Sequence, residues 1–227
     1  MEKSPPFIPQ IDGELRKHII RMPECISQAS GIRIFGKRIT SIIFSTDAAI
    51  IKNTNADAVI AVYPFTPQPA ISQAILQLAD VPVFCGVGGG TTTGARVTRL
   101  AQDAEFRGAI GVVLNAPASN ETVHYVAERV DIPVVITVVS EAEDLKARID
   151  AGAKILNVSG AGNTPEIVRA IRKSFPGIPI IATGGKTEES ILRTIEAGAN
   201  AITYTPPTTA ELFKEMMIRY RNQLAGK

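Results

Sequence analysis

Segments typical of buried strands alternate with segments typical of helices along most of the chain, and this alternation limits the possible folds more than any other feature. From the second strand-like run onward, successive runs start 22 to 27 residues apart, which suits one strand, one helix and two short loops. Consecutive parallel strands need such a helical crossover, so the pattern predicts a parallel sheet. We expect strands at 39–45, 58–63, 82–87, 109–115, 132–139, 154–159, 178–183 and 201–205, and helices at 47–54, 68–79, 93–107, 119–130, 141–151, 164–175, 187–197 and 209–223.

The stretch 178–190 shows how one repeat is built. Its first five residues are apolar and mostly β-branched, as in a strand that is covered on both faces. Gly184 and Gly185 follow, and two residues without a Cβ allow a tight turn and a close approach to a ligand. Thr187 is then expected to cap a helix whose first turn carries two glutamates, where negative charge is favourable.

A chain of 227 residues is about the right length for one (β/α)8 barrel. An open doubly wound sheet would alternate in the same way, but eight repeats of near-equal length without a long crossover favour closure. We therefore predict an α/β fold with a single (β/α)8 (TIM) barrel over residues 38–227. Residues 1–37 are expected to form an N-terminal arm and an extra helix at 12–30, interrupted near Pro23.

Composition excludes several classes of partner. The 24 lysines and arginines are scattered among 22 acidic residues and form no basic run, so we expect no nucleic acid partner. No apolar run reaches membrane-spanning length, so no membrane partner is expected. Cys25 and Cys85 make no disulfide framework. We expect a cytoplasmic protein, and a homo-oligomer in which the N-terminal arm is exchanged between subunits.

The loops that follow the predicted strands are rich in Gly, Thr, Ser and Asn and poor in His and carboxylates. In a (β/α)8 barrel these loops surround the ligand site, and their composition is typical of an anion or phosphate cradle. His18 and His124 are the only histidines, and they cannot share a helix face. We therefore expect no metal site, no Ser-His-Asp triad and no cofactor.

Three segments in the last third of the chain resemble the phosphate-binding (β/α)8 barrels. These are 180–185 (IIATGG) with the glutamate-rich helix after it, 197–199 (AGA), and the glycine-bearing loop 158–162 (VSGAG). The group includes keto-deoxy-phosphogluconate aldolases, thiamine-phosphate synthases, indole-glycerol-phosphate synthases and IMP dehydrogenases. The resemblance covers about the last 75 residues. It implies that the backbone amides of Gly184 and Gly185 hold a phosphate group.

The sequence departs from that group at two places. Thr205 is followed by two prolines, where many relatives have a glycine and a small residue, and prolines donate no backbone hydrogen bond. Asn157 stands where the aldolases carry a Schiff-base lysine, while Lys154 lies at the opposite end of that strand. The resemblance therefore does not extend to class I aldolase chemistry.

Four residues near strand ends are candidates for catalysis. Asp47 is the candidate general base, although an aspartate there could instead cap the first helix. Tyr63 and Asn157 could orient a substrate oxygen, or pack at the rim and satisfy buried backbone groups. Cys85 could be a nucleophile, but a cysteine in an apolar strand is usually inert.

The candidate binding residues lie in the loops after five strands. The glycine-rich loop that starts at Gly86 is expected to line the pocket or to close over it, and the alternative is a tight turn at the barrel rim. Lys186 could pair with an anion, or be a solvated lysine at a helix start. The binding set is Gly88, Gly89, Gly90, Thr91, Asn115, Ser159, Gly160, Gly162, Thr183, Gly184, Gly185, Lys186, Tyr204 and Thr205.

Together these features predict an enzyme that acts on a small phosphorylated metabolite, such as a sugar phosphate or keto-acid phosphate. The expected chemistry is an enol-type lyase, isomerase or epimerase step. A hydrolase or decarboxylase on the same barrel stays open. A sensor that binds the metabolite without converting it is the alternative from another class, because few acid-base residues lie near the predicted site.

Overall fold

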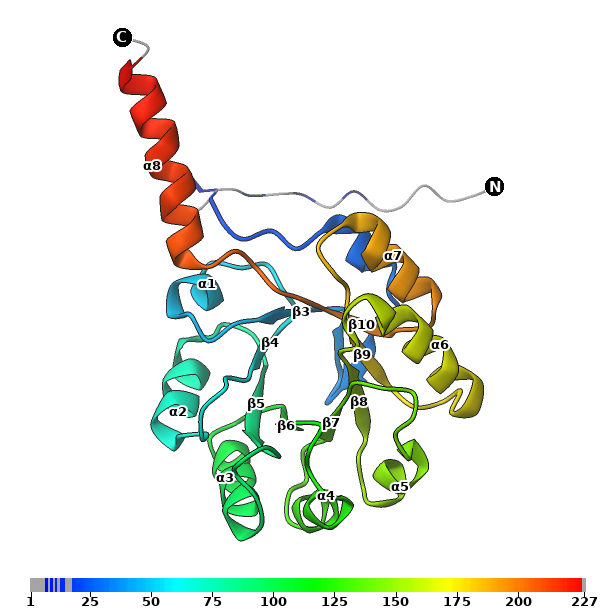
Figure 1. Ribbon diagram of the computed structural model, residues 1–227. Coiled ribbons are helices and arrows are strands. Elements are labelled where there is room, and N and C mark those ends of the chain that lie inside the picture. Colours follow the sequence, from blue (N-terminus) through cyan, green and yellow to red (C-terminus); the bar gives the residue numbers. More distant parts are fainter. Residues whose placement is uncertain (1–6, 8, 10, 12, 15–17, 226–227) are drawn as a thin grey trace.

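Eight short apolar runs form a closed parallel barrel in the computed structural model, with helices outside it (Figure 1). The structure describes residues 7, 9, 11, 13, 14 and 18–225. The barrel strands are β3 (Ser41–Phe44), β4 (Ala58–Ala61), β5 (Val83–Gly88), β6 (Gly111–Leu114), β7 (Val134–Val138), β8 (Ile155–Val158), β9 (Ile180–Thr183) and β10 (Ala201–Tyr204). The helices are α1 (Ala48–Lys52), α2 (Pro69–Leu78), α3 (Ala95–Phe106), α4 (Asn120–Ala127), α5 (Leu145–Asp150), α6 (Thr164–Ser174), α7 (Glu188–Glu196) and α8 (Thr209–Ala225).

Each barrel strand pairs with its two neighbours in parallel, and the first strand closes the ring against the last. In that closing pair, Ile202 of β10 lies opposite Ser41 of β3. The strand order is β10-β3-β4-β5-β6-β7-β8-β9, so every strand has a partner on both sides. The prediction of a single (β/α)8 barrel is confirmed. Seven of the eight expected strands contain the observed ones, β5 ends one residue later than expected, at Gly88, and most boundaries agree to within two residues.

Buried residues form two clusters, one inside the ring of strands and one between the strands and the helices. In β8, Ile155 belongs to the inner cluster and Leu156 to the outer one. The same alternation holds in β9, where Ile181 faces the interior and Ile180 faces the helices. Side chains therefore alternate along each strand between the interior and the helix layer, and we call the side on which a residue falls its parity. Only residues of inward parity can reach a ligand at the barrel mouth.

The sequence predicts a cap at Thr187, and it also has capping-box spacing at Thr208 and Glu211 and at Ser140 and Glu143. The first two caps form in the structure. Thr187 and Ser190 form a reciprocal capping box at α7. Thr208 and Glu211 do the same at α8, with Thr208 N donating to Glu211 Oε2 at 2.7 Å. Ser140 and Glu143 have the spacing of a capping box but do not start a helix. Glu143 accepts the amides of Val139 and Ser140 in a turn, and α5 starts later with Asp144 as its N-cap.

The N-terminal helical extension is not confirmed. Part of the range 12–30 lies outside the described residues, and the described part contains only the 3-10 helix η1 (Glu24–Gln28). Ile26 in η1 is 1% exposed and packs in the outer cluster, while Ile20 forms a bridge to Thr54 after α1. Within the described chain, no helix combines the length and the apolar character needed to cross a membrane.

A short antiparallel hairpin, which the sequence pattern does not predict, closes the amino-terminal end of the barrel. It consists of β1 (Ile32–Ile34) and β2 (Lys37–Ile39), with Phe35 and Gly36 at positive φ in the turn. Ile32, Ile34 and Ile39 join the inner cluster, so the hairpin covers that end of the apolar interior. The opposite end, where the strands finish, is left for a ligand.

Asp57 links the start of β4 to the start of β3 by hydrogen bonds at the amino-terminal end of the barrel. Its Oδ2 accepts hydrogen bonds from Thr40 N at 2.8 Å, Thr40 Oγ1 at 2.7 Å and Ser41 N at 3.0 Å. Burial raises the pKa of Asp57, but the hydrogen bonds from Thr40 and Ser41 outweigh it and leave the pKa below its ordinary value. The ionised carboxylate is therefore part of the folded state.

We expect Asp57→Asn to lower the free energy of unfolding by about 2 kcal/mol at pH 7, because charge-assisted hydrogen bonds are lost. A lowered folded-state pKa gives stability that is present above the unfolded-state pKa of about 3.9 and is lost as the pH falls through the folded-state pKa. Urea unfolding at pH 7 and pH 3 should therefore show a smaller difference between variant and wild type at pH 3. Asp80→Asn, at an exposed ion pair with Lys52, is the control. An equal loss at both pH values would contradict the assignment.

Candidate functional site

Neutral polar side chains surround the mouth of the barrel at the carboxyl ends of the last four strands. The inner-cluster residue Ile155 is followed two positions later by Asn157, which faces the same side of β8. In β7, β9 and β10, the residue two positions after an inner-cluster residue faces inward in the same way. The inward-facing residues at this level are Thr137, Asn157, Thr183 and Thr203.

Several polar atoms in this layer lack a strong protein partner. Asn157 Oδ1 and Thr203 Oγ1 are buried and make no hydrogen bond to any residue that the structure describes, and Thr203 is only 5% exposed. Asn157 Nδ2 reaches Thr137 Oγ1 at 3.3 Å, and Thr183 Oγ1 reaches Ser159 Oγ at 3.4 Å, both long for strong bonds. Buried polar groups are usually paired, so these atoms mark a place where a polar ligand fits.

A cavity of about 100 Å³ opens beside this layer, at the carboxyl ends of β4, β5 and β6. The hydroxyl of Tyr63 accepts a hydrogen bond from the amide of Gln68 at 2.8 Å, which fixes the ring at the rim. Asn115 follows Val113 of the inner cluster by two positions and closes the cavity from the β6 side. The lining residues are Val62, Tyr63, Pro64, Phe65, Pro67, Gly86, Gly88, Gly90, Thr91, Thr92 and Asn115.

The glycine-rich loop after β5 forms a tight, buried turn rather than a cover over the pocket. Gly89 has φ of 103°, and a Cβ there would lie 2.8 Å from the backbone N and O of Asn115. The carbonyl of Gly88 accepts the Asn115 amide at 2.9 Å. Gly88 and Gly89 thus position Asn115, while the exposed Gly90 and Thr91 line the cavity.

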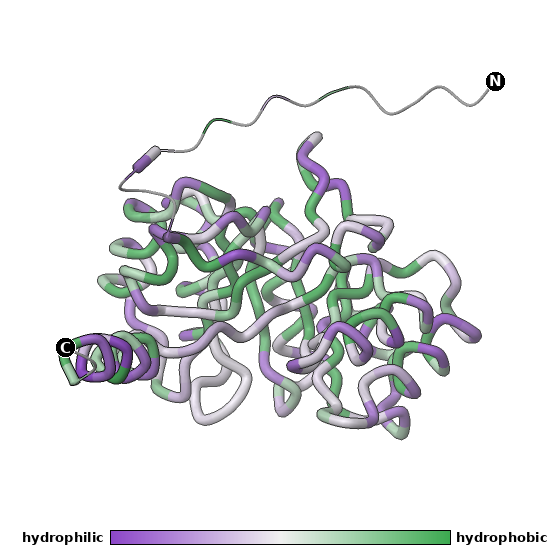
Figure 2. Tube along the Cα trace, turned by 90° about the horizontal axis from the view of Figure 1, so that it is seen from above, coloured by the Kyte–Doolittle hydropathy of each residue, from purple (hydrophilic) through white to green (hydrophobic). Residues whose placement is uncertain are grey.

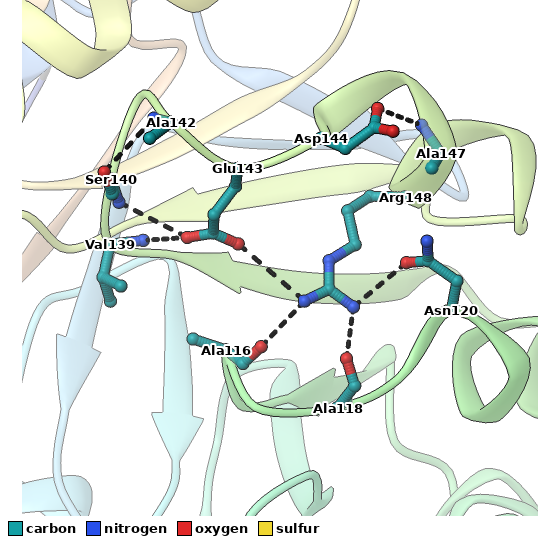
Figure 3. A network of polar contacts seen from close by, with 10 residues as sticks. All are labelled: Ala116, Ala118, Asn120, Val139, Ser140, Ala142, Glu143, Asp144, Ala147 and Arg148. Carbon is teal, nitrogen blue, oxygen red and sulfur yellow. Dashed lines mark hydrogen bonds and ion pairs between the residues drawn. The ribbon is translucent and has the colours of Figure 1, made fainter.

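One arginine joins the loops after β6 and β7 (Figure 3). Arg148 of α5 donates to the carbonyl oxygens of Ala116 at 2.9 Å and of Ala118, and to Asn120 Oδ1 at 3.1 Å. Its guanidinium also lies 3.9 Å from Glu143 Oε2, and the two side chains are 15% and 19% exposed. This network holds two mouth loops in fixed positions relative to each other.

Gly184 and Gly185 lie at the mouth, but only one of them has a free amide. Gly184 is buried, and its amide donates to Thr203 O at 3.2 Å. Gly185 has φ of 82° and is exposed, as is Lys186, and their amides donate to no group in the described part of the chain. An anion could therefore meet the amides of Gly185 and Lys186 and the ammonium group of Lys186.

A second cavity of about 290 Å³ lies between this turn and the start of α6. Gly160 is folded onto α6, because its amide donates to Thr164 Oγ1 at 3.0 Å, while Gly162 faces the cavity. Arg193 on the cavity wall is paired with Glu166. The lining residues are Ala161, Gly162, Thr164, Pro165, Thr183, Gly184, Gly185, Lys186, Thr187, Ser190, Arg193 and Thr194.

Asp47, the candidate general base, is engaged in a helix cap. Its Oδ1 accepts the amides of Ala49 at 2.8 Å and Ile50 at 3.3 Å, and its Oδ2 accepts a hydrogen bond from Thr209. The hydrogen bond from Thr209 lowers the pKa of Asp47, and the two amides lower it further. A carboxylate that is held ionised in this way is a weak base, so the capping alternative describes its environment.

Three other candidates lie away from the inward-facing layer. Cys85 is 1% exposed in the outer cluster, and burial raises the pKa of its thiol to about 12. Tyr204 packs against the outer cluster, because it has the opposite parity to Thr203. Thr205 is exposed on the loop that leads to α8. The structure does not bring these three side chains together with Asn157.

Comparison with solved structures shows the same fold at low sequence identity. A protein assigned as a phosphonomutase from Burkholderia cenocepacia superposes with a TM-score of 0.61 and 16% identity over 89% of this chain and 96% of its own. Phosphonopyruvate hydrolase in complex with oxalate and magnesium gives 0.60 and 14%, over 83% of each chain. 2,3-Dimethylmalate lyase, a member of the PEP mutase/isocitrate lyase superfamily, gives 0.61 and 13%, over 93% and 85%.

The comparisons do not single out the aldolase-like barrels that the last third of the sequence resembles. No protein-family model and no curated protein sequence matches this chain. At identities below one in five, the solved structures establish the architecture alone. The chain is a (β/α)8 barrel.

Proposed function

We propose that this protein is a lyase that binds a small keto acid, or its phosphorylated or phosphonate form, in the mouth of the barrel. The observation that supports this proposal is the pair of buried, unpartnered oxygens, Asn157 Oδ1 and Thr203 Oγ1, on the inward-facing layer. The Thr203 hydroxyl can therefore donate to a substrate oxygen, and Asn157 Nδ2 has a second N–H besides the one that points to Thr137. Asn157 Oδ1 can only accept, for example from a substrate hydroxyl. Neutral donors of this kind stabilise negative charge that develops on a carbonyl oxygen.

Cleavage of a carbon–carbon bond next to the carbonyl matches these groups best. In a substrate with a hydroxyl group on Cβ, that hydroxyl gives its proton to water and its oxygen becomes the carbonyl oxygen of the leaving aldehyde or ketone. The electron pair of the Cα–Cβ bond moves toward the keto carbonyl, so that an enolate oxygen forms and accepts hydrogen bonds from Thr203 Oγ1 and Asn157 Nδ2. The enolate carbon then takes a proton from water. Loss of carbon dioxide follows the same course, and neither route begins with removal of a proton from carbon by a strong base. The capped Asp47 makes isomerase or epimerase chemistry a poorer match, because those reactions need such a base.

The turn at Gly185 supplies the complementary end of the proposed site. The amides of Gly185 and Lys186 and the lysine side chain would hold the carboxylate or phosphate group of the substrate. Three of the four inward-facing residues, Asn157, Thr183 and Thr203, come from β8, β9 and β10, the strands beside this turn. A small, elongated anion would thus contact the turn with one end and the inward-facing layer with the other.

The solved structures of the same fold support the substrate class but not the same metal chemistry. Their names refer to phosphonates, phosphonopyruvate and dimethylmalate, which are small anionic molecules. One of them holds magnesium, which prefers carboxylate oxygens as protein ligands. The inward-facing layer here offers threonines and an asparagine. This donor set does not fit a protein-held magnesium ion.

A metabolite sensor is the second candidate. It is favoured because neither Asp47 nor Cys85 is placed to take a proton from a ligand. Asp47 is held ionised as a helix cap, and Cys85 is buried away from the layer. A site with donors but no proton acceptor binds an anion whether or not it converts it. Turnover separates the two candidates.

We expect Thr203→Val and Asn157→Leu each to lower kcat about 100-fold, because each removes a donor that acts on the developing enolate oxygen. A panel of keto acids, their phosphates and phosphonates would be screened by thermal shift and then for product formation. Thr98→Val, at a buried threonine of α3 outside the inward-facing layer, is the matched control. Binding of a panel member without any product would favour the sensor. An unchanged kcat in both variants would remove these residues from the proposed site.

We expect Lys186→Gln to weaken binding of a phosphorylated or carboxylate ligand about 5-fold at low salt, because one exposed positive charge is removed beside the anion. Titration calorimetry with inorganic phosphate, oxalate and a panel member from the thermal-shift screen would measure the change. Lys173→Gln, near the end of α6, removes the same charge elsewhere. Equal affinity in the Lys186 and Lys173 variants would place the anion away from the turn.

A further inference from the structure

Helix α8 leaves the barrel instead of packing along it. Figure 1 shows it pointing away from the ring of helices, and Figure 2 shows it almost end-on at the edge of the molecule. Its 17 residues include no buried residue, whereas α1 to α7 each bury at least one. A solitary helix of this length is only marginally stable in water, so its apolar residues need a partner.

The exposed apolar residues of α8 form a stripe. Phe213, Met217, Tyr220 and Leu224 are 57%, 42%, 49% and 73% exposed. They are spaced by four, three and four residues, which places them on one face of the helix. We call these four residues the α8 stripe.

An apolar groove lies directly beside the α8 stripe. It has a volume of about 430 Å³ and lies between α8, α1 and the segment 18–20. Phe213 belongs to both features, so groove and stripe form one continuous surface. The lining residues are His18, Ile19, Ile20, Ala49, Ile50, Asn53, Thr209, Leu212, Phe213, Met216 and Arg219.

The N-terminal segment explains why α8 is displaced. Met22 N donates to Asn55 Oδ1 at 2.7 Å, and Met22 and Ile26 belong to the outer cluster. Residues 20–28 therefore lie between α1 and α7, which are the neighbours of the last helix when the ring of helices closes. Because this position is filled within the same chain, only the start of α8, at Leu212, packs against its own barrel.

We infer that α8 docks on a second copy of this chain, with the α8 stripe of each copy in the groove of the other. A protruding helix next to a hollow is self-complementary under a two-fold axis, because each copy offers the ridge that the other lacks. The surface also has the composition of an interface core, with phenylalanine, tyrosine, methionine and arginine and few other charges.

The size of this surface matches a dimer interface. The four large apolar side chains of the α8 stripe are exposed. Burying roughly 100 Å² for each of them in two copies gives about 800 Å², and the groove walls raise this toward about 1,000 Å². Specific interfaces begin at about that area. The dimer places the assembly contact on α8 instead of on the N-terminal arm.

The test is the mass of the full chain in solution. We expect light scattering after gel filtration to give twice the chain mass of 24.2 kDa for the wild type. The double variant Met217→Glu, Leu224→Glu should give 24.2 kDa, because it places charges in the apolar contact. Its melting temperature should also lose the dependence on protein concentration that a dimer shows.

Phe106→Glu is the matched control, because Phe106 is 81% exposed at the end of α3 and far from α8 in the ring. It should keep the dimeric mass. A monomeric wild type at 100 μM would overturn the proposal. So would a double variant that stays dimeric, which would locate the contact on another surface. Circular dichroism of the double variant at the same concentration shows that its barrel is folded, so a monomeric mass cannot be attributed to unfolding.

Discussion

Closure of the strand ring is the constraint on which the rest of the molecule depends. When β10 pairs with β3, every strand has two partners, and all eight carboxyl ends are brought to one mouth. Side chains must then alternate strictly between the interior and the helix layer. At the amino-terminal end the interior is apolar and covered by the β1–β2 hairpin. At the other end the same alternation presents Thr137, Asn157, Thr183 and Thr203, so the fold alone determines which polar groups a ligand meets.

The barrel could be predicted because each repeat carries local signals that agree with the global fold. The buried run before Gly184, the cap at Thr187 and the spacing of the repeats all indicate the same unit. The β1–β2 hairpin could not be predicted, because its two strands are three residues long and carry charged residues on the exposed side. The extra helix fails for a related reason. Residues 18–28 gain their stability by packing on α1 and α7, which local propensity does not show.

The candidate site was harder to predict than the barrel, because a shift of one residue reverses the side on which a side chain lies. The loop composition points to the carboxyl-terminal end of the barrel, which is where the structure has Asn157, Asn115 and the Gly185 turn. It also suggests Tyr204 where Thr203 is the residue that faces inward, and it suggests Cys85 although that residue faces the helices. The alternation of side chains along a strand could have corrected both choices. Cys85, for example, directly follows Phe84, which faces the interior. Asp47 is ambiguous in sequence, because a cap and a base require the same residue type at a strand end.

The two ends of the chain show how one packing choice affects the whole surface. Once Met22 and Ile26 fill the space between α1 and α7, the barrel wall is complete without α8. Helix α8 is still tied to the mouth, because Thr209 at its start donates to Asp47, the cap of α1. A partner that holds α8 would therefore also restrain Asp47 and the loop after β10. In the inferred dimer, the contact between subunits and the rim of the site share this hydrogen bond, so assembly stabilises the same loops that a ligand would meet.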